Sequence, residues 1–422
     1  MKKKQWFIIV LIGFSGQLAW MLENMYLNVY MYNELGGTPT HIAWMVALSA
    51  ITATITTLVM GSISDKLGKR KPFIVVGYLI WGVSVLGFSL IHPDFLGRWF
   101  PVVSVGGLSI FLLILWDCVM TFLGSTSNDA AFNAWITDIT QPQERGRIET
   151  VLAILPLMAM LVLFGLLDPL TQSGQWSLFF SIIGIFVFIS GLLALLFIKE
   201  DSVTSSQLSL KDTIQYGFKK ETIQNNKKLY LSFLLLFVLG FSTQIWMPYL
   251  IIYIQRGLNI NDYALILGVV LIVASIISVL MGSLIDKVGK LTLLPLGLII
   301  GFLGLVGMYF SQSPLLLMVF GTVMMTGNML LTAISNGLIR DYTPESMAGR
   351  FQGVRMIFGV MLPMIFGPFL GSLVISSSKV TYEELGVIKQ VPTAHIFIVS
   401  AVVLLLILIP YRYLKKGVSH ES

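Results

Sequence analysis

Twelve long apolar stretches dominate this chain of 422 residues, and each is long enough to cross a lipid bilayer. A membrane-spanning helix needs about 20 predominantly apolar residues, because the hydrocarbon core is about 30 Å thick. The stretches occupy most of the sequence, so no sizeable water-soluble domain fits beside them. They cover residues 5–32, 40–62, 72–92, 104–136, 148–168, 177–198, 228–255, 262–283, 291–311, 314–338, 349–375 and 393–413.

The composition is that of a chain that meets lipid. Apolar residues make up 56% of the sequence and charged residues only 11%, whereas a soluble domain carries about 25% charged residues. Lys2, Lys3 and Lys4 give a basic start, but the apolar run that follows is longer than that of a cleavable signal, and no small-residue cleavage site follows it. We therefore predict an all-α membrane protein whose first span stays in the mature chain.

Lysine and arginine gather on alternate connections between the spans. They fall in the segments 66–71, 145–147, 199–228, 287–290, 340–350 and 412–416, whereas the other connections hold only Arg98, Arg256, Lys379 and Lys389. This positive-inside pattern predicts that both termini are cytoplasmic, in a plasma membrane that is expected to be bacterial. It also accounts for the net charge of +6, so no nucleic-acid partner is expected.

Two motifs recur in the same order in the two halves of the chain. Residues 60–69, MGSISDKLGK, return at 281–290 as MGSLIDKVGK, with seven of ten positions identical at an offset of 221. Asn133, Asp138, Thr140, Gly146 and Arg147 return as Asn336, Asp341, Thr343, Gly349 and Arg350 at a constant offset of 203. The offsets span six helices, an even number, so the halves are parallel repeats with one orientation in the membrane. We predict a six-helix bundle over 1–198, a cytoplasmic linker over 199–227 and a second bundle with a short tail over 228–422.

The connection Gly61-Ser-Ile-Ser-Asp-Lys-Leu-Gly-Lys-Arg-Lys71 resembles the loop signature of the major facilitator superfamily. The twelve spans, the signature in both halves and the central linker extend the resemblance over nearly the whole chain. It implies a secondary transporter that works by alternating access. Nothing in the sequence indicates an enzyme: there is no nucleophile–His pairing, metal-ligand spacing or phosphate loop. A channel would not need a duplicated pair of loop motifs.

The loop motifs carry the candidate gating residues. Gly61 and Gly68 suit tight packing and tight turns, and Asp65 can sit near a helix N-terminus, where the dipole favours an anion. Charges at the end of the fourth span, opposite Arg70, could latch the cytoplasmic side. The alternative is ordinary solvated loop charge, whose pairs contribute about 0–1 kcal/mol. The candidate latch residues are Gly61, Asp65, Gly68, Arg70, Asp138 and Arg147 in the first half, and Asp286, Asp341 and Arg350 in the second.

Three acidic residues lie well inside spans of the first half, whereas Glu149 and Asp168 lie nearer the ends of the fifth span. Ionisable groups in a membrane are costly and mark function by default. Burial disfavours the charged form of a carboxyl, so such a group can take up and release protons. The four histidines lie at span ends or in loops and offer no relay. Proton coupling, with no cofactor and no metal beyond the proton gradient, is therefore assigned to Glu23, Asp117 and Asp129.

Polar faces run along the first and fourth spans and along their repeats, the seventh and tenth. Gln17, Trp20, Asn24 and Asn28 follow at i, i+3, i+7 and i+11, one face of an ideal helix. Amide, carboxylate and indole groups suit a hydroxyl-rich neutral solute. The alternative is interhelical hydrogen bonding, worth about 0.6–2 kcal/mol for each polar side chain. The candidate substrate contacts are Gln17, Trp20, Asn24, Asn28, Asn128, Asp129, Asn133, Gln244, Trp246, Asn328 and Thr332.

The stretch Asp129-Ala-Ala-Phe-Asn-Ala-Trp-Ile-Thr-Asp138-Ile-Thr140 resembles the fourth span of the glycoside–pentoside–hexuronide cation symporters. The Lys71-Pro72-Phe73 step is similar to that family and to the sucrose–proton symporters, as is the aromatic end of the first span at 24–36. The resemblance implies that Asp129 contacts sugar and helps to bind the coupling cation.

Several positions depart from that family's pattern. Thr57 and Ala53 stand where its sodium-coupled members carry acidic residues, which argues against a sodium site. Gln17 lies near the place of the sugar-binding acid, Asn133 replaces an aromatic residue, and Ile154 lies near the place of an arginine. The resemblance thus supports a polar-solute importer more than it specifies a sugar.

The leading interpretation is a proton-coupled symporter for a sugar, glycoside or similar small polar solute, acting as a monomer. The alternative is a proton-coupled multidrug or metabolite exporter of the same superfamily. Such exporters usually carry a Gly-x-x-x-Gly-Pro-x-x-Gly-Gly run on the fifth span, which here reads LPLMAMLVLFG over 155–165. The 20 methionines and many phenylalanines could line a drug pocket, although in lipid-facing spans they more often serve packing.

Overall fold

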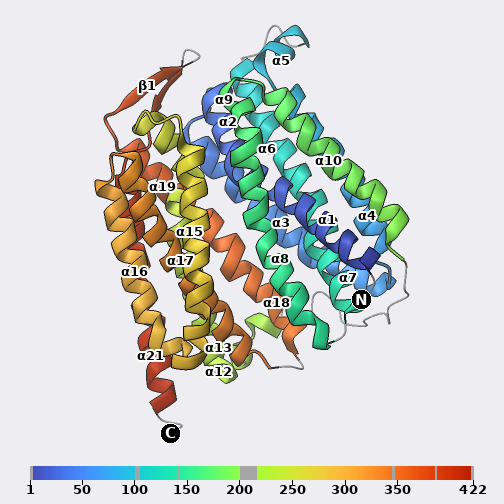
Figure 1. Ribbon diagram of the computed structural model, residues 1–422, viewed down its shortest axis with the longest axis vertical. Helices are drawn as coiled ribbons and strands as arrows, with labels where there is room; N and C mark the ends of the chain where they lie inside the picture. Colours follow the sequence, from blue (N-terminus) through green and yellow to red (C-terminus); the bar gives the residue numbers. More distant parts are fainter. Residues whose placement is uncertain are drawn as a thin grey trace. The chain divides into compact units, whose positions relative to one another are not determined.

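The computed structural model describes residues 3–99, 105–140, 142–199, 216–344, 347–384 and 387–419 (Figure 1). Its helices confirm the twelve predicted membrane spans. Their bounds are Lys4–Glu34, Pro39–Leu67, Lys71–Leu90, Gly106–Ile139, Thr150–Gln172, Trp176–Phe197, Lys227–Gly257, Tyr263–Gly282, Lys290–Phe310, Pro314–Tyr342, Phe351–Ser376 and His395–Lys416.

The chain divides into two compact units. Unit 1 comprises Met1–His41, Ile51–Leu210 and Glu384–Val387, and unit 2 comprises Ile42–Ala50, Lys211–Glu383 and Ile388–Ser422. The first half of the chain forms α1 (Lys3–Met21), η1 (Leu22–Tyr26), α2 (Leu27–Glu34), α3 (Pro39–Leu67), α4 (Lys71–Gly87), η2 (Phe88–Leu90), α5 (Pro93–Trp99), α6 (Val105–Gly124), η3 (Ser125–Phe132), α7 (Asn133–Ile139), α8 (Pro142–Val162), η4 (Leu163–Leu167), α9 (Asp168–Gln172) and α10 (Trp176–Phe197).

The second half follows the same plan and adds a short hairpin. It contains α12 (Lys220–Asn225), α13 (Lys227–Trp246), η5 (Met247–Tyr249), α14 (Leu250–Ile252), η6 (Tyr253–Gly257), α15 (Tyr263–Val288), α16 (Lys290–Phe310), α17 (Pro314–Tyr342), α18 (Ala348–Met356), η8 (Ile357–Met361), α19 (Leu362–Ser376), β1 (Thr381–Glu384), β2 (Val387–Gln390), α20 (His395–Leu404), η9 (Leu405–Ile407) and α21 (Leu408–Ser419). The two-stranded sheet β1–β2 was not predicted from the sequence.

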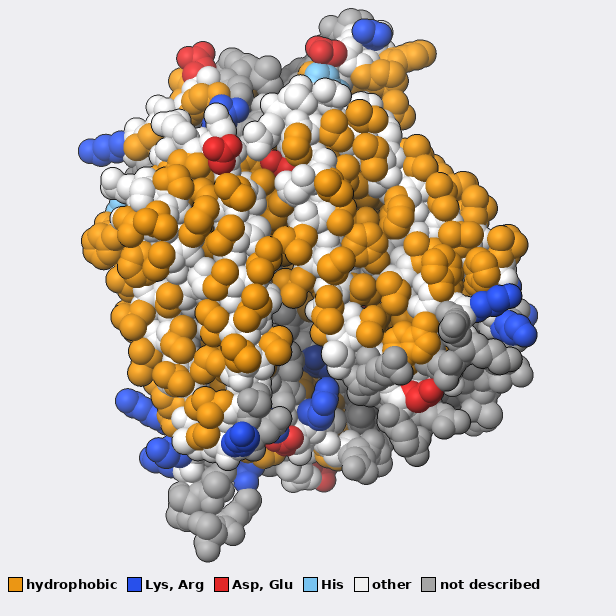
Figure 2. All heavy atoms as spheres, viewed as in Figure 1, with side chains coloured by type: hydrophobic (Ala, Val, Ile, Leu, Met, Phe, Trp, Pro, Cys, Tyr) orange, Lys and Arg blue, Asp and Glu red, His pale blue; other side chains and the backbone are white. Residues whose placement is uncertain are grey.

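The surface confirms a protein that meets lipid. Figure 2 shows hydrophobic side chains along the middle of the helices, with Lys, Arg, Asp and Glu near the helix ends. Among the exposed side chains are Leu196 at 74% and Val279 at 77% relative exposure. Extended apolar surface of this kind is rare on soluble monomers. The helices have the length and composition of membrane spans, so lipid is expected to cover this surface.

Small residues let neighbouring helices approach closely inside each unit. Helices α4 and α10 run side by side (Figure 1), and a Cβ added at Gly82 would lie 2.7 Å from the carbonyl oxygen of Gly184. In unit 2, a Cβ at Gly327 would lie 2.3 Å from the backbone nitrogen of Gly301 where α17 packs on α16. Such contacts are the usual basis of packing in a membrane, where lipid removes the hydrophobic drive between helices.

Five membrane helices contain a π-helical turn. Two of these segments, η1 and η3, hold Glu23 and Asp129. A π-turn accommodates about one extra residue, which rotates all following side chains around the helix axis, and such turns are frequent at functional sites. The register of the first and fourth spans therefore departs from the ideal helix on which the predicted polar faces were drawn.

The repeated loop motif ends α3 and α15 at equivalent glycines. Gly68 has φ 61° and Gly289 has φ 97°, both in conformations that a side chain disfavours. This fits the predicted tight turn. The expectation of tight packing at Gly61 is wrong, because a Cβ there would meet only the Ala130 Cβ, at 3.9 Å.

Candidate functional site

Two of the three predicted intramembrane acids form a buried pair in unit 1. Glu23 of η1 is 6% exposed and Asp117 of α6 is 1% exposed, and their carboxyl groups lie close enough to repel each other. The Thr121 hydroxyl, one turn beyond Asp117, donates to Glu23 Oε1 at 3.0 Å. Asp117 Oδ1 is buried and has no hydrogen-bond partner among the described residues. The free energy of burying two neighbouring carboxyl groups is much lower when they share a proton than when both are charged.

The third acid, Asp129 of η3, lies in a separate hydrogen-bonded group. Ser125 Oγ donates to Asp129 Oδ2 at 3.2 Å, and the Asn128 amide donates to Asp129 Oδ1 at 3.3 Å. The Tyr78 hydroxyl lies 2.9 Å from Asn128 Oδ1 and 3.1 Å from the Ile12 carbonyl oxygen. Asp129 is half-buried, whereas Asn128 and Tyr78 are buried. Of the three carboxyls, Asp129 is thus the one that remains accessible to a solute.

Aromatic rings of α1 and α4 pack together near the Asp129 group. The Trp20 and Trp81 ring centroids are 5.1 Å apart, and Trp81 and Tyr78 are 5.3 Å apart. Gly124 makes room for both indoles, since a Cβ there would lie 2.7 Å from Trp81 and 2.8 Å from Trp20. Tyr78 and Trp81 were not among the predicted site residues, although their spacing of three residues within an apolar span indicates that they share a helix face.

The predicted polar face of the first span holds only for its first three residues. Gln17, Trp20 and Asn24 are half-buried, but Asn28 is fully buried, with its amide donating to the Asn24 carbonyl oxygen at 2.8 Å. The intervening π-turn rotates Asn28 out of the face that its spacing predicted. Placing Asn28 on that face was therefore wrong.

Asn128 and Asn133 flank Asp129 and differ in exposure. Asn128 is 5% exposed, and its side chain connects Tyr78 to Asp129, so it orients the carboxyl. Asn133 is exposed and donates to the backbone oxygen of Asp129 at 3.2 Å. Only Asn133 of the two offers an open amide near the acid.

A further buried acid, Asp168 of α9, is fully engaged by its surroundings. The Tyr26 hydroxyl donates to Asp168 Oδ1 at 2.9 Å, Gln172 Nε2 donates to Oδ2 at 2.6 Å, and the Thr171 hydroxyl is 3.3 Å from Oδ1. These donors hold the carboxyl group in one orientation. Asp168 is therefore a structural link between the ends of the first and fifth spans.

The predicted contacts of unit 2 are packed more closely. Asn328 Nδ2 donates to Thr243 Oγ1 at 2.6 Å, and both line a space of about 10 Å³, barely enough for one water. Trp246 is 3% exposed, with its ring 6.3 Å from that of Phe397. The Asn328–Thr243 hydrogen bond joins α17 to α13, as in the hydrogen-bonding alternative, whereas Trp246 packs against α20 through its ring. Gln244 and Thr332 are half-buried.

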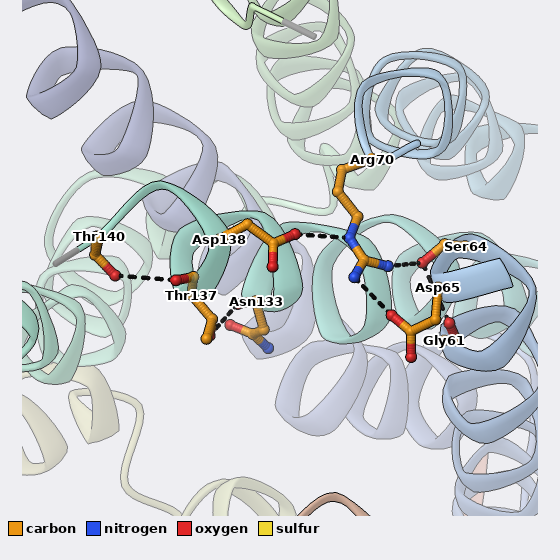
Figure 3. Close-up of polar contacts among 8 residues, drawn as sticks. All are labelled: Gly61, Ser64, Asp65, Arg70, Asn133, Thr137, Asp138 and Thr140. Atoms are coloured by element: carbon orange, nitrogen blue, oxygen red, sulfur yellow. Dashed lines mark hydrogen bonds and ion pairs between the residues drawn. The ribbon is translucent and has the colours of Figure 1, made fainter. Parts of the chain in front are cut away.

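The loop motif of unit 1 forms a charge cluster around Arg70 (Figure 3). Arg70 Nε lies 3.0 Å from Asp138 Oδ2, and Arg70 Nη2 lies 2.6 Å from Asp65 Oδ1. Arg70 Nη1 donates to Ser64 Oγ at 2.5 Å. Burial alone would lower the pKa of Arg70, but the hydrogen bonds to Asp138 and Asp65 raise it above its ordinary value. The resulting stabilisation is present at every pH below the ordinary arginine pKa, so it is constant across the neutral range.

Unit 2 repeats this arrangement with one ion pair. Lys290 Nζ lies 2.5 Å from Asp341 Oδ2, and Asp341 is the repeat of Asp138. Lys290 repeats Lys69 rather than Arg70, so the basic partner shifts by one residue between the halves. The side chains of Arg147, Asp286 and Arg350, also predicted for the latch, lie outside the described part of the structure.

Twelve membrane helices in two related halves, with acids inside the first half, define a polytopic membrane protein of the transporter type. Residues 9–278 and 232–421 match the family described as the Major Facilitator Superfamily. The chain belongs to this superfamily, and it is a transporter with the alternating-access fold, not an enzyme.

Three comparisons illustrate the relationship. The multi-drug resistance efflux pump PmrA homolog of Lactococcus lactis subsp. lactis (strain IL1403) is 27% identical over 208 residues, 46% of this chain and 48% of that protein. The match thus spans about half the length of that relative. A bacterial homologue of the human lysosomal transporter Spinster gives a TM-score of 0.75 at 13% identity, covering 99% of this chain and 98% of its own. The nucleoside transporter NupG gives 0.69 at 14% identity, covering 99% and 100%. At these identities the solved structures establish the shared fold.

Proposed function

We propose that this protein couples proton movement to the transport of a small polar solute, with the buried Glu23–Asp117 pair as the proton site. The pair carries the proposal because two carboxyls with 6% and 1% exposure lie together inside the membrane-spanning part of unit 1. Adding or removing a proton at such a pair strongly changes the free energy of the conformation that buries it. No cofactor is needed, since the proton gradient supplies the driving force.

The solute is assigned to the surface beside Asp129. Asp129 is half-buried and held by Ser125 and Asn128, and Trp20 and Gln17 are half-buried on the first span. An oriented carboxyl on the fourth span and an indole ring on the first span suit a hydroxylated solute, whose apolar ring face stacks while its hydroxyls donate. The resemblance of residues 129–140 to the glycoside–pentoside–hexuronide symporters points the same way. A sugar or glycoside is therefore the first substrate class to test.

Uptake into proteoliposomes provides the test. The purified protein is reconstituted, a proton gradient is imposed, and accumulation of a panel of radiolabelled sugars and glycosides is followed. Asp117→Asn should abolish gradient-driven accumulation and retain solute exchange, whereas Asp129→Asn should impair both. Asp168→Asn removes a buried acid that is bonded by three side chains, so it is the matched control and should keep coupling. If accumulation survives in Asp117→Asn and Glu23→Gln, the assignment of the proton site is wrong.

The second candidate is a proton-coupled exporter of drugs or metabolites. The 27% identity to an efflux pump over 208 residues favours it. An assay of the same liposomes for proton-driven movement of ethidium-like dyes distinguishes solute import from drug export. Dye movement that requires the Glu23–Asp117 pair, together with no uptake of any sugar, would replace the symporter proposal with this one.

We also propose that the Arg70 and Lys290 clusters tune the balance between outward- and inward-facing states at the cytoplasmic side. The support is that both halves place a basic loop residue on the aspartate that ends the fourth span of its own unit. Asp65→Asn and Arg147→Ala should shift that balance and change the transport rate. Unchanged values in both variants would refute a gating role. We place the transporter in a plasma membrane, with cytoplasmic termini, as a monomer.

A further inference from the structure

Unit 2 contains a pocket of about 380 Å³ that the proposed transport mechanism does not use. Its volume falls within the range of about 300–1,000 Å³ that is usual for small-molecule sites. Three parts of unit 2 meet there: the end of the seventh span, the end of the ninth span and the chain on either side of the β1–β2 hairpin. The pocket is therefore built by the tertiary fold of this unit and not by a single loop.

The pocket lies at the end of unit 2 that is opposite to the Lys290–Asp341 ion pair. Lys290 begins α16, and the pocket residue Tyr309 lies near the other end of the same helix. Figure 1 shows the hairpin strand β1 at one end of unit 2 and α21 at the other. With the Lys290 end in the cytoplasm, as proposed above, the pocket belongs to the outer side of the membrane.

The hairpin wall of the pocket is fixed by two contacts. The Val391 backbone nitrogen donates to the Val380 carbonyl oxygen at 3.1 Å, which closes the base of the hairpin where both residues line the pocket. The Arg256 guanidinium lies 4.8 Å from the centroid of the Tyr382 ring, a cation–π contact that joins β1 to the end of the seventh span. Strand β1 follows directly after Val380, so this contact also holds that wall in place.

A glycine lets the chain after the hairpin approach the seventh span closely. A Cβ added at Gly257 would lie 2.7 Å from the Pro392 carbonyl oxygen and 3.0 Å from Tyr253 Cδ2. All three residues line the pocket. A side chain at position 257 would therefore push the Pro392 wall away from the tyrosine, so the glycine preserves the shape of the pocket.

Two tyrosine rings give the pocket an aromatic lining. The Tyr253 ring packs nearly perpendicular to that of Phe397, with centroids 5.3 Å apart, and the Tyr309 ring packs nearly perpendicular to that of His395 at 5.5 Å. Tyr253 is buried, whereas Tyr309 is half-buried. Rings held in this way are a preorganised surface for the apolar face of a ring-shaped ligand.

The polar groups beside the rings can both donate and accept hydrogen bonds. Gln312 is exposed just beyond the end of α16, and Thr393 is half-buried with its hydroxyl 3.2 Å from His395 Nδ1. An amide or a hydroxyl offers a donor and an acceptor, as do the hydroxyls of a neutral ligand. Tyrosine alone is common at the end of a membrane span. The combination of tyrosines with these groups around one cavity is what indicates a ligand.

From this arrangement we propose that the pocket binds a small neutral molecule with a hydroxylated ring, that is, a sugar or glycoside. The apolar face of the ring packs on the tyrosines, and its hydroxyls bond Gln312 and Thr393. The ring can belong to a soluble molecule or to a glycolipid headgroup, because either presents the same groups. The Asp129 surface belongs to unit 1, so binding at this pocket does not depend on the proposed transport function.

Binding is tested by titration calorimetry on the full-length Asp129→Asn protein, which lacks the acid assigned to the transported solute. The protein is held in phospholipid nanodiscs, because glycoside detergents would compete for the pocket, and 4-nitrophenyl glucoside is the soluble probe. Tyr309→Ala should weaken its affinity about tenfold through the lost ring contact. Gln312→Ala should weaken it about threefold or more through a lost hydrogen bond. Tyr309→Phe keeps the ring, so its affinity should fall between those of Tyr309→Ala and the parent.

A matched variant and a lipid arm complete the test. Tyr413→Ala removes a tyrosine of α21 that is 62% exposed and lies outside the described lining, so it should bind the probe like the parent. Gln312 is exposed, so Gln312→Ala keeps the test valid if Tyr309→Ala fails to fold. In nanodiscs that contain a glucosyl diacylglycerol, loss of probe binding identifies a headgroup as the ligand, and unchanged binding identifies a soluble one.

The proposal is overturned if the Asp129→Asn protein does not bind the probe, or if Gln312→Ala and Tyr309→Phe both bind it as tightly as the parent. Failure of sugar uptake by the wild-type protein would count against the proposed transport function alone, because calorimetry measures binding in a protein that already lacks the Asp129 carboxyl.

Discussion

Arg70 Nε lies 3.0 Å from Asp138 Oδ2, which joins the loop before the third span to the end of the fourth span, 68 residues further along the chain. In unit 2 the equivalent connection is made by Lys290 and Asp341 at 2.5 Å. Each half of the duplicated chain has therefore kept this link inside its own unit. The basic partner has moved by one position, so the aspartate is the fixed element of the pair.

Replacement of Arg70 should destabilise unit 1. Its side chain is only 8% exposed and bonds Asp138, Asp65 and Ser64. Arg70→Ala leaves these groups without their cation and should cost about 2–3 kcal/mol, less than the roughly 3–5 kcal/mol for breaking a fully buried pair, since the aspartates are partly exposed. The measurement is unfolding of the purified protein in a mild detergent, followed by tryptophan fluorescence. Asp94→Asn is the control, because Asp94 is 88% exposed and its pair with His92 should contribute almost nothing. Equal losses in both variants would contradict this account.

The two glycines of the same loop should respond differently to alanine. Gly68 ends α3 in the left-handed conformation at φ 61°, where a side chain costs about 1–2 kcal/mol. Gly61 lies in the helix with no atom closer than 3.9 Å to an added Cβ. Gly68→Ala should therefore lower the unfolding midpoint, and Gly61→Ala should leave it unchanged or raise it slightly, since alanine favours a helix. Destabilisation by Gly61→Ala would show that the position is packed more tightly than the structure indicates.

The spans and the repeat were predictable because each depends on local sequence. Hydropathy alone gave twelve helices, since a bilayer imposes a minimum apolar length on every one of them. The repeated Gly68 and Gly289 were also readable, because a turn with positive φ selects glycine. The family assignment followed from these features and is confirmed by residues 9–278 and 232–421.

The side-chain faces were less predictable because they depend on helix register. An ideal helix puts Asn28 beside Gln17, but the π-turn at Leu22–Tyr26 rotates it into the buried interior. Hydropathy carries no sign of such a turn. The connection from Tyr78 through Asn128 to Asp129 likewise joins helices that are distant in sequence. The hairpin β1–β2 was missed for a related reason, since eight residues outside the spans give little pattern to read.

The Tyr78 hydroxyl should matter for both stability and substrate affinity. It lies 2.9 Å from the oxygen of Asn128, whose amide donates to Asp129. Tyr78→Phe leaves that buried oxygen without its donor and should cost about 1–2 kcal/mol. It should also raise the KM for solute several-fold with little change in maximal rate, because Asn128 no longer fixes the carboxyl. Transport kinetics in liposomes measure this, with Tyr413→Phe, at an exposed ring, as the control. An unchanged KM would mean that Asp129 is oriented by Ser125 alone.

Conversion of the buried acids to amides should separate coupling from stability. Asp117 is 1% exposed beside Glu23, so Asp117→Asn removes a costly carboxyl and should raise the unfolding temperature, more so at high pH, where the wild-type pair would have to bear charge. Asp168→Asn should do the opposite, because one carboxylate oxygen is replaced by an amide NH2 group, which places a donor against either Tyr26 or Gln172, the two side chains that donate to this carboxylate. The two variants should also differ in function, with Asp117→Asn losing proton-driven accumulation and Asp168→Asn keeping it in correctly folded protein. Thermal unfolding from pH 6 to pH 9, together with uptake in the same preparation, measures both. A gain in stability for Asp168→Asn, or a loss for Asp117→Asn, would show that the two carboxyls have been assigned each other's roles.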